Sequence, residues 1–367
     1  MALDEDAVAR LRLIRTPSIG PITCYQLLQR FGSAERAIAA IPDLARRGGG
    51  RPPAVATRAA VEREAAAVAK AGAGYLFIGR DDYPPALAEL ESAPPALIVA
   101  GDMALLRRPA VALVGARNAS AAAVRFARQI AHELAAAGRV VISGLARGID
   151  TAAHNSALEG GTIAVVAGGI DIFYPPENEG LQRAIAERGL VISEQPPGTE
   201  PYARHFPTRN RIIAGLAEGT VVIEAAPRSG SLITARLAAE AGREVMAVPG
   251  SPLDPRAQGC NQLIRDGATL VQSAADVITT LRPFGDGRVA VPDGSFAPQP
   301  APADASDADR RAVTRLLSPS AVAVDELIRQ SGLAPATVQT VLLELELGGR
   351  LDRHAGGRVS LADSAGP

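Results

Sequence analysis

From about residue 75 the chain alternates short apolar segments with longer alanine-rich segments, and no other feature constrains the fold as strongly. The segments with strand composition are 96–99, 110–114, 139–142, 162–166, 190–193, 220–223, 244–248 and 269–271. Strands that alternate with helices predict an α/β fold with a mainly parallel sheet and helices on both faces. Ligands of such sheets bind at the carboxyl ends of the strands. The sequence therefore predicts a large α/β domain over 75–288 with its site at that edge.

A glycine loop follows the predicted strand 139–142. The loop, Ser143-Gly144-Leu145-Ala146-Arg147-Gly148, precedes a segment of helical composition at 151–158. Glycine allows close approach of a ligand to the backbone, and a helix start presents unpaired N–H groups to an anion. Arg147 adds a forked donor that suits phosphate oxygens. The loop is equally consistent with a plain strand-to-helix turn and a solvated Arg147.

A second glycine turn, Ser229-Gly230-Ser231, follows the predicted strand 220–223, and Ser231 is well placed to cap the next helix. We expect the two turns to lie at adjacent strand ends and to face one crevice. The segment 206–211 carries two arginines that flank Asn210. If this segment crosses the crevice mouth, it supplies guanidiniums for phosphates and Phe206 for stacking.

Two smaller modules flank the α/β domain. Residues 1–72 are largely helical, with a tight Ile19-Gly20 turn that resembles a helix-hairpin-helix. Such turns hold a DNA phosphate in some proteins and only pack in others, and both roles stay open. Residues 289–308 have linker composition. Three predicted helices, at 311–317, 324–328 and 334–347, and a hairpin at 350–361 then predict a winged helix over 309–367.

The winged helix should not read DNA. Its third helix has no basic residue and ends with Glu344 and Glu346, whereas helices that enter the major groove expose basic or amide side chains. We expect this module to serve protein contacts or regulation.

Composition narrows the class of protein. A net charge of −1 gives no global attraction for nucleic acid, so any such site must be local. A hydrophobic content of 47%, no signal-peptide pattern and no long apolar run indicate a soluble cytoplasmic protein without a membrane partner. Cys24 and Cys260 fall in different predicted domains, which also fits a reducing compartment. No metal-ligand spacing and no Walker A motif is present, so we expect neither a metal nor a cofactor.

A series of motifs resembles the DNA-processing protein A family, also called DprA or Smf. These motifs are Val114-Gly115-Ala116-Arg117, Ser143 to His154, Ala167 to Asp171 with Tyr174-Pro175, Ser193-Glu194, Phe206 to Leu216, Glu224-Ala225, Ser229 to Ala235 and Val248-Pro249-Gly250. The resemblance implies an extended Rossmann-like domain that binds single-stranded DNA, forms a homodimer and helps load the RecA recombinase during natural transformation. Ala116 departs from the small hydroxyl residue that the family often has there.

The resemblance also implies site residues. The expected DNA contacts are Arg117, Ser143, Gly144, Arg147, Gly148, Arg209, Asn210 and Arg211, and the second glycine turn adds Ser229, Gly230 and Ser231. The expected dimer interface includes Gln262, Ile264 and Leu270.

An enzyme is the alternative class. A related Rossmann-like superfamily cleaves nucleoside monophosphates with a glutamate that follows a glycine-rich helix start. Here the first turn after Ser231 offers no acid, and Glu240 lies more than two turns away. We therefore expect a binding protein without catalytic residues.

Four further polar residues lie near the predicted crevice. Asp171, Glu194 and Glu224 follow predicted strands, and we expect them to hold loops and arginines because carboxylates repel phosphate. His154 is open to two interpretations: a buried histidine satisfied by a neighbouring carbonyl, or a functional group.

Overall fold

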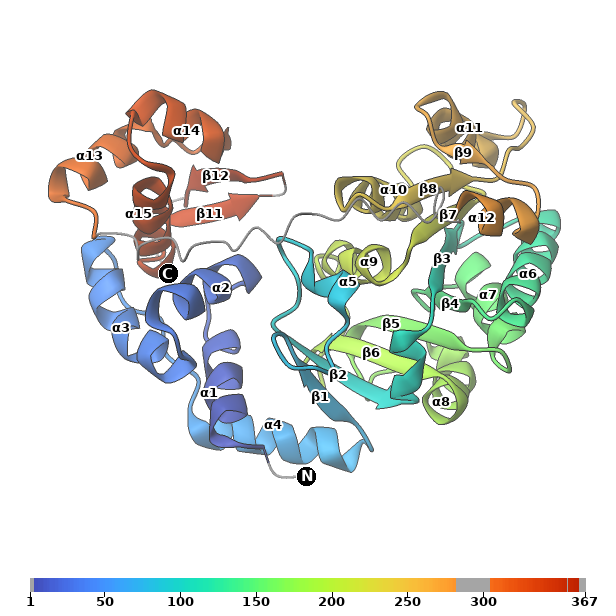
Figure 1. Ribbon diagram of the computed structural model, residues 1–367, viewed down its shortest axis with the longest axis horizontal. Helices are drawn as coiled ribbons and strands as arrows, with labels where there is room; N and C mark the ends of the chain where they lie inside the picture. Colours follow the sequence, from blue (N-terminus) through green and yellow to red (C-terminus); the bar gives the residue numbers. More distant parts are fainter. Residues whose placement is uncertain (1–2, 282–303, 355, 363–367) are drawn as a thin grey trace, which may run out of the picture. The chain divides into compact units, whose positions relative to one another are not determined.

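The computed structural model describes residues 3–281, 304–354 and 356–362. The chain forms two compact units, one over Glu64–Gly287 and one that combines Ala2–Arg63 with Arg288–Pro367 (Figure 1). Most of the predicted linker, 289–303, lies outside the described residues, and its last residues lead into a helix that begins at Asp307. No helix in the described ranges is long and apolar enough to cross a membrane.

A nine-stranded sheet organises the first unit, in the order β1-β2-β6-β5-β4-β3-β7-β8-β9. The strands are β1 (Gly74–Phe77), β2 (Ala96–Gly101), β3 (Ala110–Gly115), β4 (Val140–Ser143), β5 (Thr162–Gly169), β6 (Leu190–Gln195), β7 (Gly219–Ile223), β8 (Glu244–Ala247) and β9 (Thr269–Leu270). Strands β3 to β9 pair in parallel, whereas β1 pairs with β2 and β2 with β6 in antiparallel fashion. The predicted mainly parallel sheet is confirmed, and the antiparallel edge strand β1 was not predicted.

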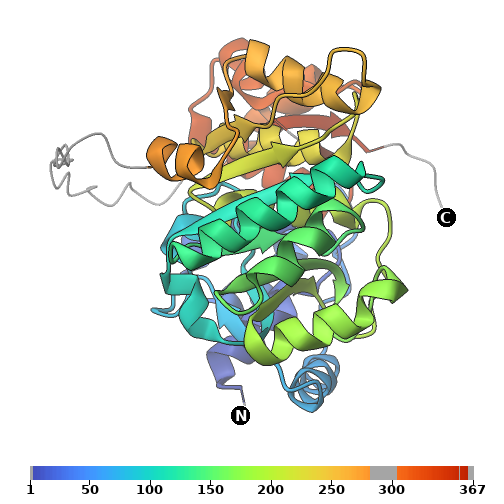
Figure 2. The ribbon, with the colours of Figure 1, turned by 90° about the vertical axis from the view of Figure 1, so that its right-hand side faces the viewer.

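Helices cover both faces of this sheet. One face carries α4 (Arg58–Lys70), α6 (Ala121–Ala136), α7 (Ile149–Ala157), α8 (Glu179–Arg188) and α12 (Ala274–Thr280), and the other carries α5 (Pro85–Ala88), α9 (His205–Leu216), α10 (Gly230–Glu240) and α11 (Gln258–Arg265). Figure 2 shows α6, α7 and α8 in front of the sheet. Side chains of β3 alternate between the two cores, with Ala112 on one side and Leu113 on the other. This alternation is the period of two that a strand imposes.

The second unit joins two helical modules. The first has α1 (Glu5–Ile14), α2 (Pro21–Phe31) and α3 (Ala34–Arg47). The second has α13 (Asp307–Leu316), α14 (Val324–Ser331) and α15 (Pro335–Leu347), with a sheet of β10 (Val322–Ala323), β11 (Leu351–His354) and β12 (Arg358–Leu361). The predicted winged helix is confirmed.

The third helix of the winged helix is a packing element. Leu343 and Leu347 of α15 share a core with Leu27 and Ile41 of the first module. The chain after α3 approaches α15 so closely that a Cβ on Gly48 would overlap the Glu344 carbonyl oxygen. The helix that would enter a DNA groove in other winged helices is therefore largely covered.

The acids of α15 are neutralised within the unit. Glu344 accepts hydrogen bonds from Arg310 at 2.7 and 2.9 Å, and Glu346 accepts one from Arg353 at 2.8 Å. Both carboxylates are therefore paired with arginines. That the winged helix does not read DNA stays a prediction, and the burial of α15 supports it.

Candidate functional site

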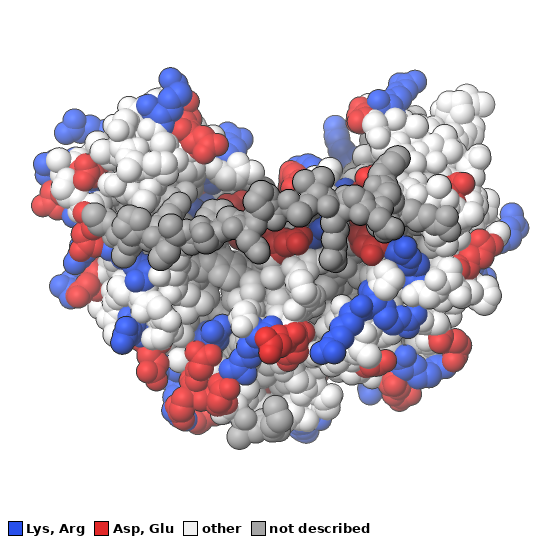
Figure 3. Space-filling model, viewed as in Figure 1, with Lys and Arg blue, Asp and Glu red and all other residues white. Residues whose placement is uncertain are grey.

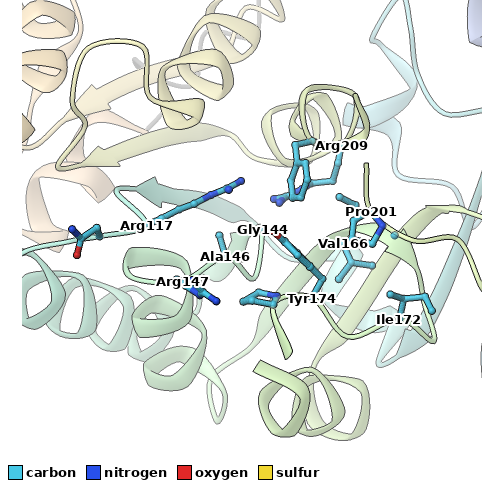
Figure 4. Close-up of a pocket in the computed structure, with 14 residues that line it drawn as sticks. Arg117, Gly144, Ala146, Arg147, Val166, Ile172, Tyr174, Pro201 and Arg209 are labelled. Carbon is cyan, nitrogen blue, oxygen red and sulfur yellow. The ribbon is translucent and has the colours of Figure 1, made fainter. Parts of the chain in front are cut away.

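Two neighbouring pockets lie at the carboxyl edge of the parallel strands. The first, of about 300 Å³, we call the aromatic pocket (Figure 4). Its lining comprises Arg117, Asn118, Gly144, Ala146, Arg147, Val166, Ala167, Gly168, Ile172, Tyr174, Pro175, Pro201, Phe206 and Arg209. The second, of about 560 Å³, we call the glycine pocket, because it extends from the end of β3 to the Ser229-Gly230-Ser231 turn. Arg117, Asn118, Ala146, Phe206 and Arg209 line both.

Arg209 lies between the two pockets. Its side chain comes from α9 and is only 7% exposed, and within the described residues its Nε has no hydrogen-bond partner. Burial lowers the pKa of Arg209 to about 10, the nearby Asp150 opposes that shift, and Arg117 adds to it. The guanidinium therefore stays charged at neutral pH. A buried guanidinium with an unsatisfied N–H at a pocket wall can donate to an anionic ligand.

The first glycine loop packs directly against this arginine. A Cβ at Gly144 would overlap Nη1 of Arg209, so only glycine leaves room for the guanidinium. Asp150 holds the loop, because its Oδ2 accepts hydrogen bonds from the Gly144 N–H at 3.1 Å and the Ala146 N–H at 3.2 Å. Burial raises the pKa of Asp150, and Arg209 opposes that shift.

Arg117 and two aromatic rings complete the wall of the aromatic pocket. The Arg117 guanidinium lies 5.1 Å from the centroid of the Phe206 ring, and that ring lies 5.6 Å from the Tyr174 ring. Figure 4 shows Arg117 and Arg209 directed toward each other above the loop that carries Gly144 and Ala146. Two cations from different elements thus converge beside an aromatic surface.

Arg147 is exposed, as Arg117 is, whereas Arg209 is buried. The Arg147 side chain forms an ion pair with Glu177. That contact raises the pKa of Arg147 and lowers the pKa of Glu177. The structure therefore places Arg147 at the rim of the aromatic pocket with its charge partly neutralised.

Three residues expected to contact DNA have structural roles instead. Ser143 is fully buried and donates to the Leu113 carbonyl at 2.6 Å, so its hydroxyl cannot reach a ligand. Gly148 has φ of 76°, and a Cβ there would overlap the Ala116 carbonyl oxygen. Arg211 points away from both pockets and donates to Glu194 at 2.6 Å. Segment 206–211 is part of a helix, so positions 209 and 211 lie roughly 200° apart around its axis.

The second glycine turn differs from the prediction in two respects. Ser229, and not Ser231, caps α10, because the Ser229 hydroxyl accepts a hydrogen bond from the Ser231 N–H. Strand β3 lies between β4 and β7, so the two glycine turns flank it and are not at adjacent strand ends. Asn210 links the turn to α9 by donating to the Gly230 carbonyl at 3.3 Å. The turn still faces the same crevice, since Ser229, Gly230 and Ser231 line the glycine pocket.

The carboxylates near this edge hold loops and arginines, as predicted. Asp171 accepts a hydrogen bond from the Gly198 N–H at 2.8 Å, and Glu224 accepts one from the Ser120 N–H at 2.7 Å. Glu194 holds Arg211.

His154 is buried beneath the glycine loop. Its Nδ1 lies 2.8 Å from the hydroxyl of Thr162, where the sequence suggested a carbonyl partner. Burial first, and Arg209 second, lower the pKa of His154 to about 3, so it is neutral at physiological pH.

Within the ranges that the structure covers, no group of three or more His, Cys, Asp and Glu side chains could hold a metal ion. Cys24 and Cys260 are free and buried, and burial raises their thiol pKa values to about 12 and about 11.

The residues expected at the dimer interface lie on or near β9, an edge strand of the sheet. Leu270 of β9 is 46% exposed, and Gln262 on α11 is exposed. Ile264 is partly buried and packs against the core, so it contributes less free surface than expected. Leu253, in the loop before α11, is 92% exposed.

Comparisons with known proteins agree with this architecture. Residues 74–282 match the model of DNA recombination-mediator protein A, residues 4–67 match a DprA-like N-terminal HHH domain, and residues 297–357 match a DprA winged helix domain. DNA processing protein DprA of Streptococcus pneumoniae is 49% identical over 200 residues, which cover 54% of this chain and 71% of that protein. Protein Smf of Synechocystis is 35% identical over 307 residues, which cover 76% of this chain and 77% of that protein.

Two solved structures share the fold. The crystal structure of DprA from Streptococcus pneumoniae has a TM-score of 0.65 and 39% identity, and the match covers 76% of this chain and 98% of that one. A structure that concerns the single-stranded DNA binding mode of DNA processing protein A from Helicobacter pylori has a TM-score of 0.52 and 31% identity, and the match covers 56% and 95%. The family model alone spans more than half of the sequence. This chain belongs to the DNA-processing protein A (DprA/Smf) family.

Proposed function

We propose that the two pockets bind single-stranded DNA. The observation that carries this proposal is the buried guanidinium of Arg209, which faces both pockets and has no carboxylate hydrogen-bonded to it among the described residues. Basic and acidic side chains are interspersed over the face in Figure 3, so attraction of DNA must come from such a local site.

Each part of the site has its own role in this proposal. Arg117 and Arg209 bind a backbone phosphate, and the Gly230-Ser231 backbone at the start of α10 binds a neighbouring one, because a helix start attracts anions. A base enters the aromatic pocket and stacks against Tyr174 or Phe206. Phosphate and stacking contacts are largely independent of sequence, so the binding is expected to be non-specific.

A binding role fits better than a nucleotide-cleaving role. The first turn of α10 carries Ser231, Leu232 and Ile233 and no acid, and Glu240 at the far end of the helix lies 3.5 Å from Arg236. Asp150 is buried and occupied by two backbone N–H groups. The first turn of α10 therefore offers no carboxylate that could act on a bound sugar.

By membership of the family, we further propose a homodimer that works in the cytoplasm and delivers single-stranded DNA to the RecA recombinase. The dimer would form at the β9 edge, where Leu270 and Leu253 are exposed. Burial of such apolar side chains is a main driving force of association. Light scattering should therefore report a dimer, and Leu270→Glu should shift it to a monomer.

The DNA site is tested by anisotropy of labelled oligo-dT with the double variant Arg117→Ala/Arg209→Met. Methionine fills the space of the buried arginine without its charge. Removal of both guanidiniums should weaken binding about 100-fold, roughly 2.7 kcal/mol. The slope of log K against log salt should fall by about 0.7 for each phosphate that the protein no longer neutralises.

The matched control is Arg183→Ala/Arg236→Ala. Both arginines are exposed, each pairs with a glutamate on its own helix, and neither lines the two pockets. This control should bind oligo-dT within twofold of wild type. Unchanged affinity and salt slope in Arg117→Ala/Arg209→Met, or equal affinity of wild type for duplex DNA, would contradict the assignment.

A further inference from the structure

The second unit contains a basic groove that the DNA site does not include. It has a volume of about 400 Å³ and lies between the end of α3, α13 and α15. Its basic lining is Arg47, Arg310, Arg311, Arg315 and Arg350. Val341 and Leu345 of α15 form part of its floor. Residues from both helical modules are needed to form the groove, so it exists only when the modules are packed together.

Two of these arginines already have carboxylate partners. Arg310 makes a two-pronged pair with Glu344, whose side chain is 1% exposed. Arg47 pairs with Asp304 at 2.9 Å, and this contact lowers the pKa of Asp304. These pairs fix the groove walls, and their charges are balanced.

The other three arginines are not balanced by any carboxylate of the described residues. Arg311 and Arg315 lie one turn apart on α13 with exposed side chains, and neither forms an ion pair in this part of the chain. Arg350 is exposed at the opposite wall and donates to the Gly48 carbonyl at 3.2 Å, a contact that does not neutralise its positive charge. The groove therefore presents net positive charge, and Val341 and Leu345 beneath it are only 1% and 3% exposed.

The chemistry of the groove distinguishes between anionic ligands. Single-stranded nucleic acid is usually held by aromatic stacking, and the described lining of the groove includes no aromatic ring. Guanidiniums form forked pairs with carboxylates, and the aliphatic stems of the groove arginines can pack against an aliphatic side chain. We propose that the basic groove binds an acidic, leucine-containing segment of a partner protein, with its carboxylates on Arg311 and Arg315.

The test uses full-length protein and a fluorescein-labelled peptide that repeats Glu-Asp-Leu, with unlabelled oligo-dT present in excess to occupy the DNA site. Anisotropy should detect saturable binding. Arg311→Gln/Arg315→Gln should weaken it tenfold or more, because two charge-assisted hydrogen bonds are removed. Both substituted side chains are exposed on the surface of α13, so the fold should be retained.

Two controls test whether peptide binding depends on the groove itself or only on the overall charge of the protein and the peptide. Arg36→Gln/Arg329→Gln removes the same charge from exposed arginines of this unit outside the groove and should change peptide affinity less than twofold. A peptide that repeats Gln-Asn-Leu should bind at least tenfold more weakly than the acidic one. Absence of peptide binding, equal losses in both double variants, or displacement of the peptide by oligo-dT would overturn the proposal. The DNA site in the first unit is tested separately, with oligo-dT alone and the Arg117→Ala/Arg209→Met variant.

Discussion

Arg209 in the first unit and Arg310 in the second show two different uses of a poorly exposed guanidinium. Arg310 is held by both carboxylate oxygens of Glu344, at 2.7 and 2.9 Å. Arg209 has no such partner among the described residues and faces two pockets. Glu344 satisfies the guanidinium of Arg310 within the protein. The guanidinium of Arg209 keeps an N–H group that can donate to a ligand. This difference in pairing supports the proposal that Arg209 contributes to a DNA site in the first unit.

The largest effect should come from breaking the complete pair. Arg310→Ala leaves the buried carboxylate of Glu344 without its cation, and removal of one partner from a buried pair costs about 3 kcal/mol or more. We expect a loss of about that size in the free energy of unfolding of the second unit, measured by urea titration.

Two variants serve as comparisons in that titration. Arg310→Met/Glu344→Leu removes both charges and should recover most of the loss, because an apolar pair can replace a buried ion pair. Arg209→Met in the first unit should cost less than Arg310→Ala, because it breaks no hydrogen-bonded carboxylate pair in the described part of the chain and removes only the longer-range attraction between Arg209 and Asp150. An equal loss in Arg209→Met and Arg310→Ala would remove the distinction between the two regions.

Local patterns were sufficient to predict most elements of this fold, although strand β1 was missed. Apolar runs marked eight strands, all found within a few residues of their expected ends. Because strand ends in a parallel sheet share one edge, the same patterns also brought Arg117 and Gly144 to one site, whereas Arg209 reaches that site from helix α9.

Contacts between distant residues could not be predicted in this way. The sequence offers Arg209 and Arg211 as equal candidates, and only the helical geometry of α9 turns one to the pockets and the other to Glu194. The order of β4, β3 and β7 depends on the whole sheet. Helix α15 is covered because it shares a hydrophobic core with the N-terminal helices, which lie far from it in the sequence.

His154 provides a pH test of the region beneath the glycine loop. Its pKa is about 3 when folded and near 6.5 when exposed, so the unfolded chain takes up a proton that the folded chain excludes. The contribution of neutral His154 to stability is therefore fully present above about pH 6.5. It is lost progressively as the pH falls from 6.5 toward 3. Between pH 7 and pH 5 the contribution of this group should fall by about 2 kcal/mol.

The variant His154→Asn isolates this contribution. Asparagine has no proton to gain in this range, so the slope of unfolding free energy against pH should become shallower between pH 7 and pH 5, whatever its absolute stability. The same slope in wild type and variant would show that His154 is not buried in the neutral form.

The smallest effect should come from one methyl group at the DNA site. Gly144→Ala places a Cβ where Nη1 of Arg209 lies, and the flexible end of that side chain must move. We expect the affinity for oligo-dT to fall about tenfold, roughly 1.4 kcal/mol, while the fold is retained.

Gly180→Ala is the matched control, because a Cβ there meets nothing within 4 Å and the position lies in helix α8. It should leave affinity unchanged. If Gly144→Ala binds as tightly as Gly180→Ala, the position of the Arg209 guanidinium against the loop does not matter for DNA, and the contrast between the unpaired and the paired arginine loses its functional meaning.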